Sequence, residues 1–270
     1  MADRITVAIT DGVADVRLAR PDKMNALDIA MFEALVGTTA RLSRERGLRA
    51  VVLSGEGRAF CAGLDMGRFA AMKDSGGAGL PGGADRDLAA RTHGEANFPQ
   101  QAVWGWRRLP VPVIAAVHGV AFGGGFQLAL GADMRFLTPD ARMSIMEIKW
   151  GLVPDMAGTP ILARLVRDDV LRDLTYTGRV FSAQEALAYG LATRIVDDPH
   201  AAALEAARDI ANKSPDAIRA AKRMFNALGG DPAPALMSES VEQQKLIGSP
   251  NQREAVAANI EQRPPRFADL

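Results

Sequence analysis

Three successive glycines, Gly123 to Gly125, are the feature that most constrains how this chain can fold. They follow an apolar run, residues 113–117, that predicts a buried strand, and they precede residues 126–130, which predict a helix. Glycine lets a backbone approach a neighbour or a ligand closely. The unpaired amides at a helix start also carry partial positive charge. The run therefore indicates either a site for an oxyanion or a phosphate, or a tight turn where strand and helix pack closely.

The composition limits the class of protein. The chain has 270 residues, 48% of them hydrophobic, which suits one large α/β domain or one domain with a helical appendage. The formal net charge is zero, so the charge favours neither nucleic acid nor an anionic membrane as a partner. A single cysteine, Cys61, excludes an intrachain disulfide, and with only three histidines no metal site is expected. No apolar run is long enough to span a bilayer and no secretory signal is recognisable, so we expect a cytoplasmic protein.

Strands and helices alternate early in the chain, and helices dominate late. Residues 5–9 and 13–18 alternate around an Asp11-Gly12 turn and predict a hairpin. Apolar residues recur at helical spacing from Asp28, the expected cap, to about residue 46. Further helices are predicted over 99–109, 160–166, 168–177 and 182–189, and strands over 50–53, 132–137 and 190–196. The pattern predicts an α/β fold with a helical C-terminal third that starts near residue 198.

Two other stretches suggest places where a ligand can meet the backbone. Small residues follow a strand at residues 60–65, Phe-Cys-Ala-Gly-Leu-Asp. Residues 70–96 are rich in glycine and then charged, which indicates a mobile surface loop. The loop is either a lid over a site or a plain insertion.

Several motifs together resemble those of one family. They are Arg20-Pro21-x-Lys23-x-Asn25-Ala26-Leu27, residues 57–65, 112–125 and 151–159, and residues 177–186 followed by Gly190-Leu191. In this order and at these separations they resemble the crotonase family, the enoyl-CoA hydratase/isomerase group, over residues 5–268. The resemblance implies a crotonase (ClpP-like) spiral of ββα units over residues 1–198 and a helical trimerisation region over 199–270. It also implies a homotrimer or a dimer of trimers.

The resemblance implies an acyl-CoA thioester as substrate, with coenzyme A as part of that substrate and no separate cofactor. By position, the backbone amides of Ala62 and Gly124 form an oxyanion hole that stabilises a thioester enolate. The implied substrate-binding residues are Lys23, Met24, Ala26, Gly63, Leu64, Asp65 and Gly123. Lys23 is placed to meet a phosphate, or is a solvated loop lysine, and we expect Asp65 mainly to order the local backbone.

The acid/base positions depart from those of the family's hydratases, which use two glutamates. The first position is Gln127 here, and the second, twenty residues later, is Glu147. A glutamine amide can orient water but cannot usefully transfer a proton at neutral pH. Asp155 stands where the family's dienoyl-CoA isomerases have an aspartate, although it also suits a cap of a helix beginning at residue 156. The alternative for Glu147 is a solvated charge.

We therefore expect a double-bond isomerase of enoyl-CoA or dienoyl-CoA esters, because isomerisation needs only one carboxylate to remove and return a proton. The first alternative is an enoyl-CoA hydratase of fatty-acid β-oxidation. The second is an acyl-CoA binding protein without catalysis, which the missing carboxylate at residue 127 would permit.

Overall fold

The larger of two sheets begins with the predicted hairpin. The structure, a computed structural model, describes residues 3–67, 87–228 and 230–267. The larger sheet has the strand order β1 (Ile5–Thr10), β2 (Val13–Leu18), β3 (Ala50–Gly55), β4 (Val113–Val117), β6 (Met134–Leu137) and β9 (Arg194–Ile195). Only β1 and β2 are antiparallel; the other neighbours run parallel. Asp11 and Gly12 both have positive φ, 49° and 78°, as the predicted turn requires.

A smaller sheet contains β5 (Val120–Phe122), β7 (Arg142–Ser144) and β8 (Phe181–Ser182). The chain places β4 in the larger sheet, β5 in the smaller one and then a helix, and it repeats the step with β6 and β7. Cys61 extends the small sheet through a parallel bridge to Ala121. This repeat confirms the predicted spiral of ββα units. The sequence did not predict these short strands, because two or three residues are too few to show an alternation.

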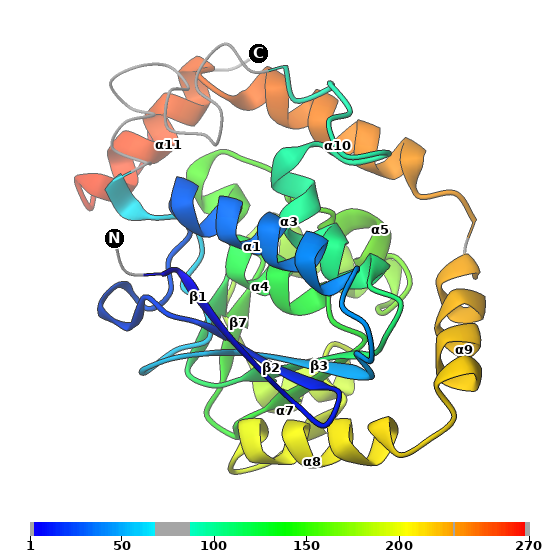
Figure 1. Cartoon of the computed structure of the whole chain (residues 1–270). Coiled ribbons are helices and arrows are strands. Elements are labelled where there is room, and N and C mark those ends of the chain that lie inside the picture. The colour runs from blue at the N-terminus through cyan, green and yellow to red at the C-terminus, as the bar shows by residue number, and fades with distance from the viewer. Residues whose placement is uncertain (1–2, 68–86, 229, 268–270) are drawn as a thin grey trace.

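Helices on one side of the larger sheet surround the main core (Figure 1). They include α1 (Ile29–Leu42), α3 (Phe98–Arg108) and α4 (Gly124–Leu130), with α6 (Asp168–Thr177) and α7 (Ala183–Ala188) further along the chain. Asp28 caps α1 as predicted, since its carboxylate accepts a hydrogen bond from the Met31 amide. The predicted start of α4 is two residues late, because Gly124 and Gly125 already belong to the helix.

The prediction for the segment after residue 155 is wrong in detail. The helix expected over 160–166 is α5, Gly158–Leu162, and its N-cap residue is Ala157. Asp155 therefore does not cap it. Two short 3-10 helices, Pro21–Lys23 and Glu147–Trp150, precede this region. We predicted a lid or an insertion over residues 70–96, and residues 70–86 of that stretch lie outside the described residues.

The C-terminal third is helical, as predicted. It contains α8 (Pro199–Ala211), α9 (Pro215–Ala227), α10 (Ala233–Leu246) and α11 (Pro250–Ile260). Ala203 and Ala207 of α8 pack against the face of the larger sheet that is turned away from the main core. In Figure 1, α9, α10 and α11 curve around the outside of the spiral, and α10 crosses above α5. The boundary at residue 198 and the role of 199–270 in trimerisation stay predictions.

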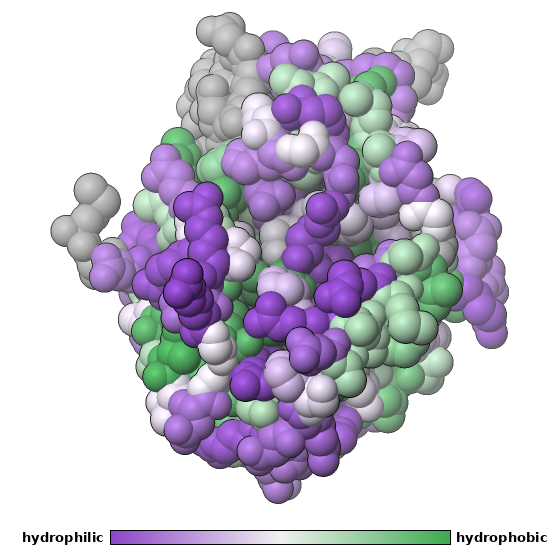
Figure 2. Space-filling model, turned by 45° about the vertical axis from the view of Figure 1, so that its right-hand side comes forward, coloured by the Kyte–Doolittle hydropathy of each residue, from purple (hydrophilic) through white to green (hydrophobic). Residues whose placement is uncertain are grey.

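Figure 2 shows a face on which hydrophilic side chains predominate and hydrophobic ones form smaller areas between them. The most exposed large apolar side chains include Met224, Phe225 and Leu228 at the end of α9. Within the described residues, no helix combines the length and the hydropathy needed to cross a membrane.

Candidate active site

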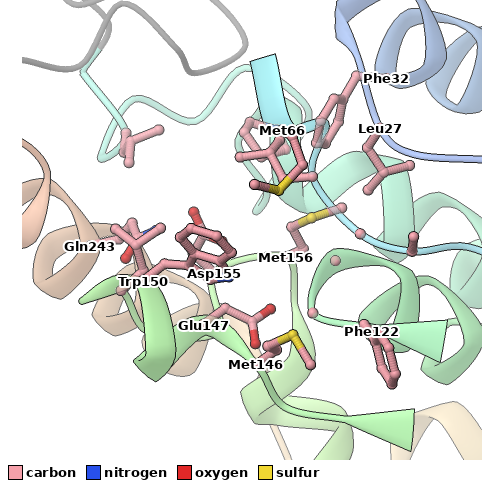
Figure 3. Close-up of a pocket in the computed structure, with 18 residues that line it drawn as sticks. Leu27, Phe32, Met66, Phe122, Met146, Glu147, Trp150, Asp155, Met156 and Gln243 are labelled. Carbon is pink, nitrogen blue, oxygen red and sulfur yellow. The ribbon is translucent and has the colours of Figure 1, made fainter. Parts of the chain in front are cut away.

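The glycine run, the 62–64 segment and the 146–156 segment enclose one mainly apolar cavity of about 170 Å³. Two carboxyl side chains, Glu147 and Asp155, line it. Figure 3 shows both on the same side of the cavity, with Phe32 and Met66 across from them. An apolar chamber with two acids suits a hydrocarbon chain whose protons are to be moved.

The glycine run opens one backbone amide to this cavity. Gly123 has a positive φ of 51° and is the N-cap of α4, and its N–H donates to the Ser144 carbonyl. No described residue accepts a hydrogen bond from the Gly124 N–H, and Gly124 lines the cavity. A Cβ on Gly125 would lie 2.3 Å from the Cys61 carbonyl oxygen. Gly125 thus permits the close packing of strand and helix, which was one interpretation of the glycine run. Gly124 presents an unpaired amide, as the other interpretation, an anion site, requires.

The facing segment, residues 61–65, corrects one of our expectations. The Ala62 N–H donates to the Met24 carbonyl at 2.9 Å, so it is not free to bind an oxyanion. The amides of Cys61 and Asp65 are also used, by the carbonyls of Val120 and Leu27. The Leu64 N–H has no acceptor among the described residues, and Leu64 lines the cavity. The Gly63 N–H donates to the Cys61 sulfur. The unpaired amide of this segment is therefore that of Leu64, two residues later than predicted.

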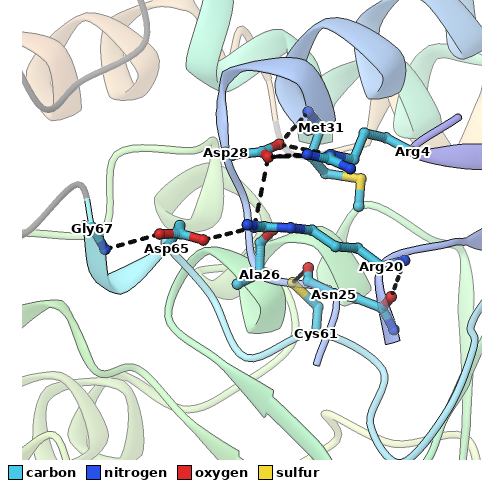
Figure 4. Close-up of polar contacts among 9 residues, drawn as sticks. All are labelled: Arg4, Arg20, Asn25, Ala26, Asp28, Met31, Cys61, Asp65 and Gly67. Carbon is cyan, nitrogen blue, oxygen red and sulfur yellow. Dashed lines mark hydrogen bonds and ion pairs between the residues drawn. The ribbon is translucent and has the colours of Figure 1, made fainter. Parts of the chain in front are cut away.

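A network of polar contacts holds the 61–65 segment against the loop at residues 20–28 (Figure 4). Arg20 pairs with Asp65 at 2.7 Å and donates to the Ala26 carbonyl at 2.9 Å. Buried Asn25 has a positive φ of 55°, and its side-chain amide donates to the carbonyls of Glu56 and Ala59. Asp65 therefore orders the local backbone, which fits the role that we expected for it.

Three of the predicted substrate-binding residues, Lys23, Met24 and Ala26, do not line the cavity. Lys23 is exposed, Met24 binds the Ala62 amide through its carbonyl, and Ala26 is buried beneath Arg20. By contrast, Gly63, Leu64 and Gly123 do line it. Cys61 is buried and its burial raises the pKa of the thiol to about 12, which makes it a packing residue rather than a nucleophile.

Gln127 lies behind Glu147 rather than in the cavity. Its side chain is buried, and its carbonyl oxygen accepts hydrogen bonds from the amides of Met156 (2.9 Å) and Gly158 (3.1 Å). Because those donors fix the orientation of the amide, its nitrogen points to Glu147 and donates to Oε1 at 2.6 Å. The other carboxyl oxygen of Glu147, Oε2, is buried and has no partner among the described residues. Gln127 thus holds one oxygen of Glu147, while the other is buried without a partner among the described residues.

Burial changes the acidity of both carboxyl groups. Glu147 is only 8% exposed, and desolvation raises its pKa to about 7, although the hydrogen bond from Gln127 opposes this rise. Desolvation raises the pKa of Asp155 to about 8, and the nearby charges of Glu147 and Glu239 add to the rise. At neutral pH Glu147 is thus the more readily ionised of the two. Carboxyl groups with such values can exchange protons with carbon acids near neutrality.

Sequence reasoning missed two polar residues of α10 at this site. Gln243 lines the cavity and donates a hydrogen bond to Asp155, and its oxygen accepts from the Val153 amide at 3.0 Å. Glu239 accepts from the amides of Ala157 and Thr159 at the start of α5. Both residues lie more than 80 positions beyond Asp155 in the sequence. Their only sequence signal is that they are polar residues on the side of α10 that faces the protein interior. Such a signal does not identify the groups that these side chains contact.

A profile of the enoyl-CoA hydratase/isomerase family matches residues 8–270. The chain is similar to a probable enoyl-CoA hydratase of Rhodobacter capsulatus, with 36% identity over 97% of each chain. It is 33% identical to the mevalonyl-coenzyme A hydratase SIDH of Beauveria bassiana, over 94% of this chain and 90% of that one. It is also 35% identical to the mitochondrial Delta(3,5)-Delta(2,4)-dienoyl-CoA isomerase of Mus musculus, over 78% of this chain and 64% of that relative's length.

Solved structures agree with the sequence comparison. An enoyl-CoA hydratase/isomerase from Mycobacterium paratuberculosis superposes with a TM-score of 0.83 at 28% identity, covering 95% of this chain and 98% of that one. A putative enoyl-CoA hydratase from Streptomyces coelicolor is 35% identical with a TM-score of 0.73, covering 98% of this chain and 94% of that one. With its spiral fold, its cavity and these similarities, the chain belongs to the enoyl-CoA hydratase/isomerase family, the crotonase family.

Proposed function

We propose that this crotonase-family protein is a double-bond isomerase of enoyl-CoA or dienoyl-CoA esters, with Glu147 as its acid/base and Asp155 as the second acid. The orientation of Gln127 is the observation that carries the proposal. Its amide is bound by two backbone N–H groups and by Glu147, so it neither reaches the cavity nor transfers a proton. Two carboxyls remain in the cavity, and they are separated along the wall of an apolar chamber.

The free amides of Leu64 and Gly124 are the proposed oxyanion hole. Both residues line the cavity, and neither N–H has an acceptor among the described residues. The Gly124 amide also stands at the start of α4, where the helix dipole favours negative charge. A thioester oxygen between them would gain charge as the enolate forms, and one such donor typically contributes about 2.7–4 kcal/mol of transition-state stabilisation.

The proposed reaction moves one proton along the acyl chain. Ionised Glu147 removes a proton from the carbon next to the thioester, and the electron pair of that C–H bond passes through the carbonyl to the oxygen. The double bond shifts when a carbon further along the chain takes up a proton and the enolate collapses. Asp155, which stays protonated to higher pH, delivers that proton, and a proton passing from Glu147 back to Asp155 restores the starting state. Lys23, Met24 and Ala26 lie outside the cavity, and we propose them for the coenzyme A moiety.

An enoyl-CoA hydratase is the second candidate, because two of the similar chains carry hydratase names. Hydration requires a water held between two groups that can exchange protons with it. Glu147 and Asp155 could serve as such a pair if the cavity admits water beside the acyl chain.

Assays on crotonyl-CoA, a 3-enoyl-CoA and a 3,5-dienoyl-CoA separate these candidates. We expect isomerisation to exceed hydration. E147Q should lower isomerisation by about 10²–10⁴-fold, the usual contribution of an acid/base group. D155N should affect the dienoyl ester most, because its proton must reach a more distant carbon. A surface variant, Q184E on α7, is the control for loss of folding.

Two results would reject the assignment. Fast hydration of crotonyl-CoA that E147Q leaves unchanged would exclude Glu147 as the acid/base. Tight binding of all three esters without turnover would instead support an acyl-CoA binding protein.

A further inference from the structure

The loop that carries Asp155 is held by side chains rather than by its own secondary structure. Gln243 binds the Val153 amide, and Glu239 binds those of Ala157 (3.0 Å) and Thr159 (2.7 Å). The side-chain oxygen of Gln127 accepts from two further amides of the loop, those of Met156 and Gly158. Five amides within residues 153–159 are thus taken by three buried side chains, two of them from α10.

Glu239 is the charged member of this set and is only 4% exposed. Each of its oxygens accepts an amide hydrogen bond at the start of α5, and Oε2 also accepts from Gln100 at 2.9 Å. Donors of this kind favour the ionised carboxylate, whereas burial opposes it and raises the pKa of Glu239 to about 7. A buried carboxylate with this many donors is well placed to carry charge inside the protein.

The charged and polar groups that face Asp155 come from two elements. Glu147 approaches from the 3-10 helix before the loop, and Glu239 and Gln243 approach from α10. The cation that Glu239 faces is Arg91, which donates to Ser240 and to Gln100. Asp155 therefore meets two acids, and within the described part of the chain no cation is among the groups that shift its pKa. A carboxyl group beside two others keeps its proton to higher pH.

We propose that Glu239 is a positioning residue for Asp155: through its bonds to the Ala157 and Thr159 amides it shapes the loop, and through its negative charge it keeps Asp155 protonated as a proton donor. The proposal rests on the function proposed above for Asp155. It adds a third carboxyl group, from a helix outside the spiral, to the machinery of proton transfer. It also separates two contributions, one of geometry and one of charge, that different variants can test.

The E239Q variant removes the charge and keeps the length of the side chain, but its NH2 group leaves either the Ala157 or the Thr159 amide without its acceptor. The pKa of Asp155 rather than kcat is therefore the measurement that isolates the charge. The pKa of Asp155 should then fall, because a neighbouring negative charge is lost. The alkaline limb of the pH–rate profile, where Asp155 loses its proton, should move down by about one pH unit. E242Q is the matched control, since Glu242 lies one turn away on α10, is 55% exposed and pairs with Lys245, and it should leave the limb in place.

The E239D variant keeps the charge but is too short to reach both amides. It should lower kcat at least about tenfold, as misplaced catalytic groups do, and leave the alkaline limb where it is. An effect of Glu239 on folding alone would reduce the amount of active protein without moving the limb in either variant, and that result would refute the proposal. If E239Q does not fold, an E239D limb that moves by a full unit would refute it in the same way.

Carbon-13 NMR titration of the Asp155 carboxyl group, assigned with D155N, reports its pKa without any turnover. A fall of about one unit in E239Q supports the positioning role even if no ester is isomerised, in which case only the proposed function fails. An unchanged Asp155 titration in folded E239Q contradicts the proposal whatever the activity.

Discussion

Gln127 shows how one amide can change what a neighbouring acid does. Its carbonyl is bound by two backbone amides, so its nitrogen can only face Glu147. The amide then binds one oxygen of that carboxylate and offsets part of the rise in the pKa of Glu147 that burial causes. The residue type at position 127 therefore determines whether Glu147 has a second carboxyl group or a hydrogen-bond donor of fixed orientation beside it.

The Q127E variant should not behave as a simple gain of a second acid. The new carboxylate would lie where the amide is, about 2.6 Å from Oε1 of Glu147, and two carboxylates at that distance cannot both be ionised. One carboxyl of the pair should ionise first, at residue 127, where the Met156 and Gly158 amides favour the charged form. The pKa of Glu147, the second to ionise, should then rise. The acidic limb of the pH–rate profile, which reports ionisation of this base, should move up by at least about one unit.

The control for this variant is Q184E, the same change on the exposed surface of α7, which should leave the acidic limb in place. An unmoved limb in Q127E would mean that residue 127 does not share its environment with Glu147.

At the scale of elements, the junction between α4 and the 61–65 segment positions the two free amides. Gly125 lies in the first turn of α4 against the Cys61 carbonyl, and Gly124 beside it leaves room for Leu27 and Met156. The short distance across this junction allows the Leu64 and Gly124 amides to face one cavity.

Two helical glycines allow a matched test of this junction. G125A would place a Cβ 2.3 Å from the Cys61 carbonyl oxygen, so it should destabilise the fold by about 1–3 kcal/mol and reduce activity by displacing Gly124. G37A, within α1, meets nothing within 4 Å and should stabilise the fold by about 0.5–1 kcal/mol without changing kcat. Urea unfolding and steady-state rates measure both effects. Equal stability changes in the two variants would argue against a packing role for Gly125.

At the scale of the whole molecule, some carboxyl groups have a raised pKa and others a lowered one. The free energy of unfolding should therefore decrease both toward high pH and toward low pH. Burial raises the pKa of Glu147, Asp155 and Glu239. For Glu254, the hydrogen bond from Arg263 instead lowers the pKa to about 2. A raised carboxyl contributes stability that is present below its unfolded pKa, about 4, and lost as the pH rises through its folded pKa. A lowered carboxyl does the opposite, and its contribution is lost as the pH falls below about 4.

We therefore expect the melting temperature to be highest near pH 4–5, above the unfolded pKa of the carboxyls, and to fall between about pH 5 and 8 as the three raised carboxyls ionise. The fall should be at least about 2–4 °C, the change that roughly 1 kcal/mol produces in a chain of this size. Replacing Asp155 by asparagine removes one of the raised groups, so the D155N curve should be flatter over that range. Differential scanning calorimetry across pH 4–9 measures both curves. A melting temperature that rises steadily to pH 9 would contradict the protonated state of this cluster.

Much of the fold followed from local patterns in the chain. The hairpin at residues 5–18, the cap at Asp28 and the helix Asp168–Thr177 each depend on residues close in sequence, so periodicity and turn chemistry were sufficient to predict them. The order and spacing of the motifs were also enough to identify the family, and with it the positions of Glu147, Asp155 and the glycine run.

The remaining features required the three-dimensional structure because they depend on contacts between distant segments. Which amide of residues 61–65 is free depends on which one Met24 uses, and this made Leu64 the candidate in place of Ala62. The length of α5 and the shape of the Asp155 loop depend on Glu239 and Gln243, some 80 residues further along the chain.

The sequence by itself determined which chemical groups are available: two glycine-rich backbone segments, one glutamate, one aspartate and a glutamine at residue 127. Only the tertiary structure decided which of their atoms are exposed to a substrate, because hydrogen-bond donors and acceptors are used up by partners that the spiral brings together. For this reason the sequence predicted which residues belong to the site, but not the unpaired amide of Leu64, the fixed orientation of Gln127 or the buried carboxyl group of Glu239.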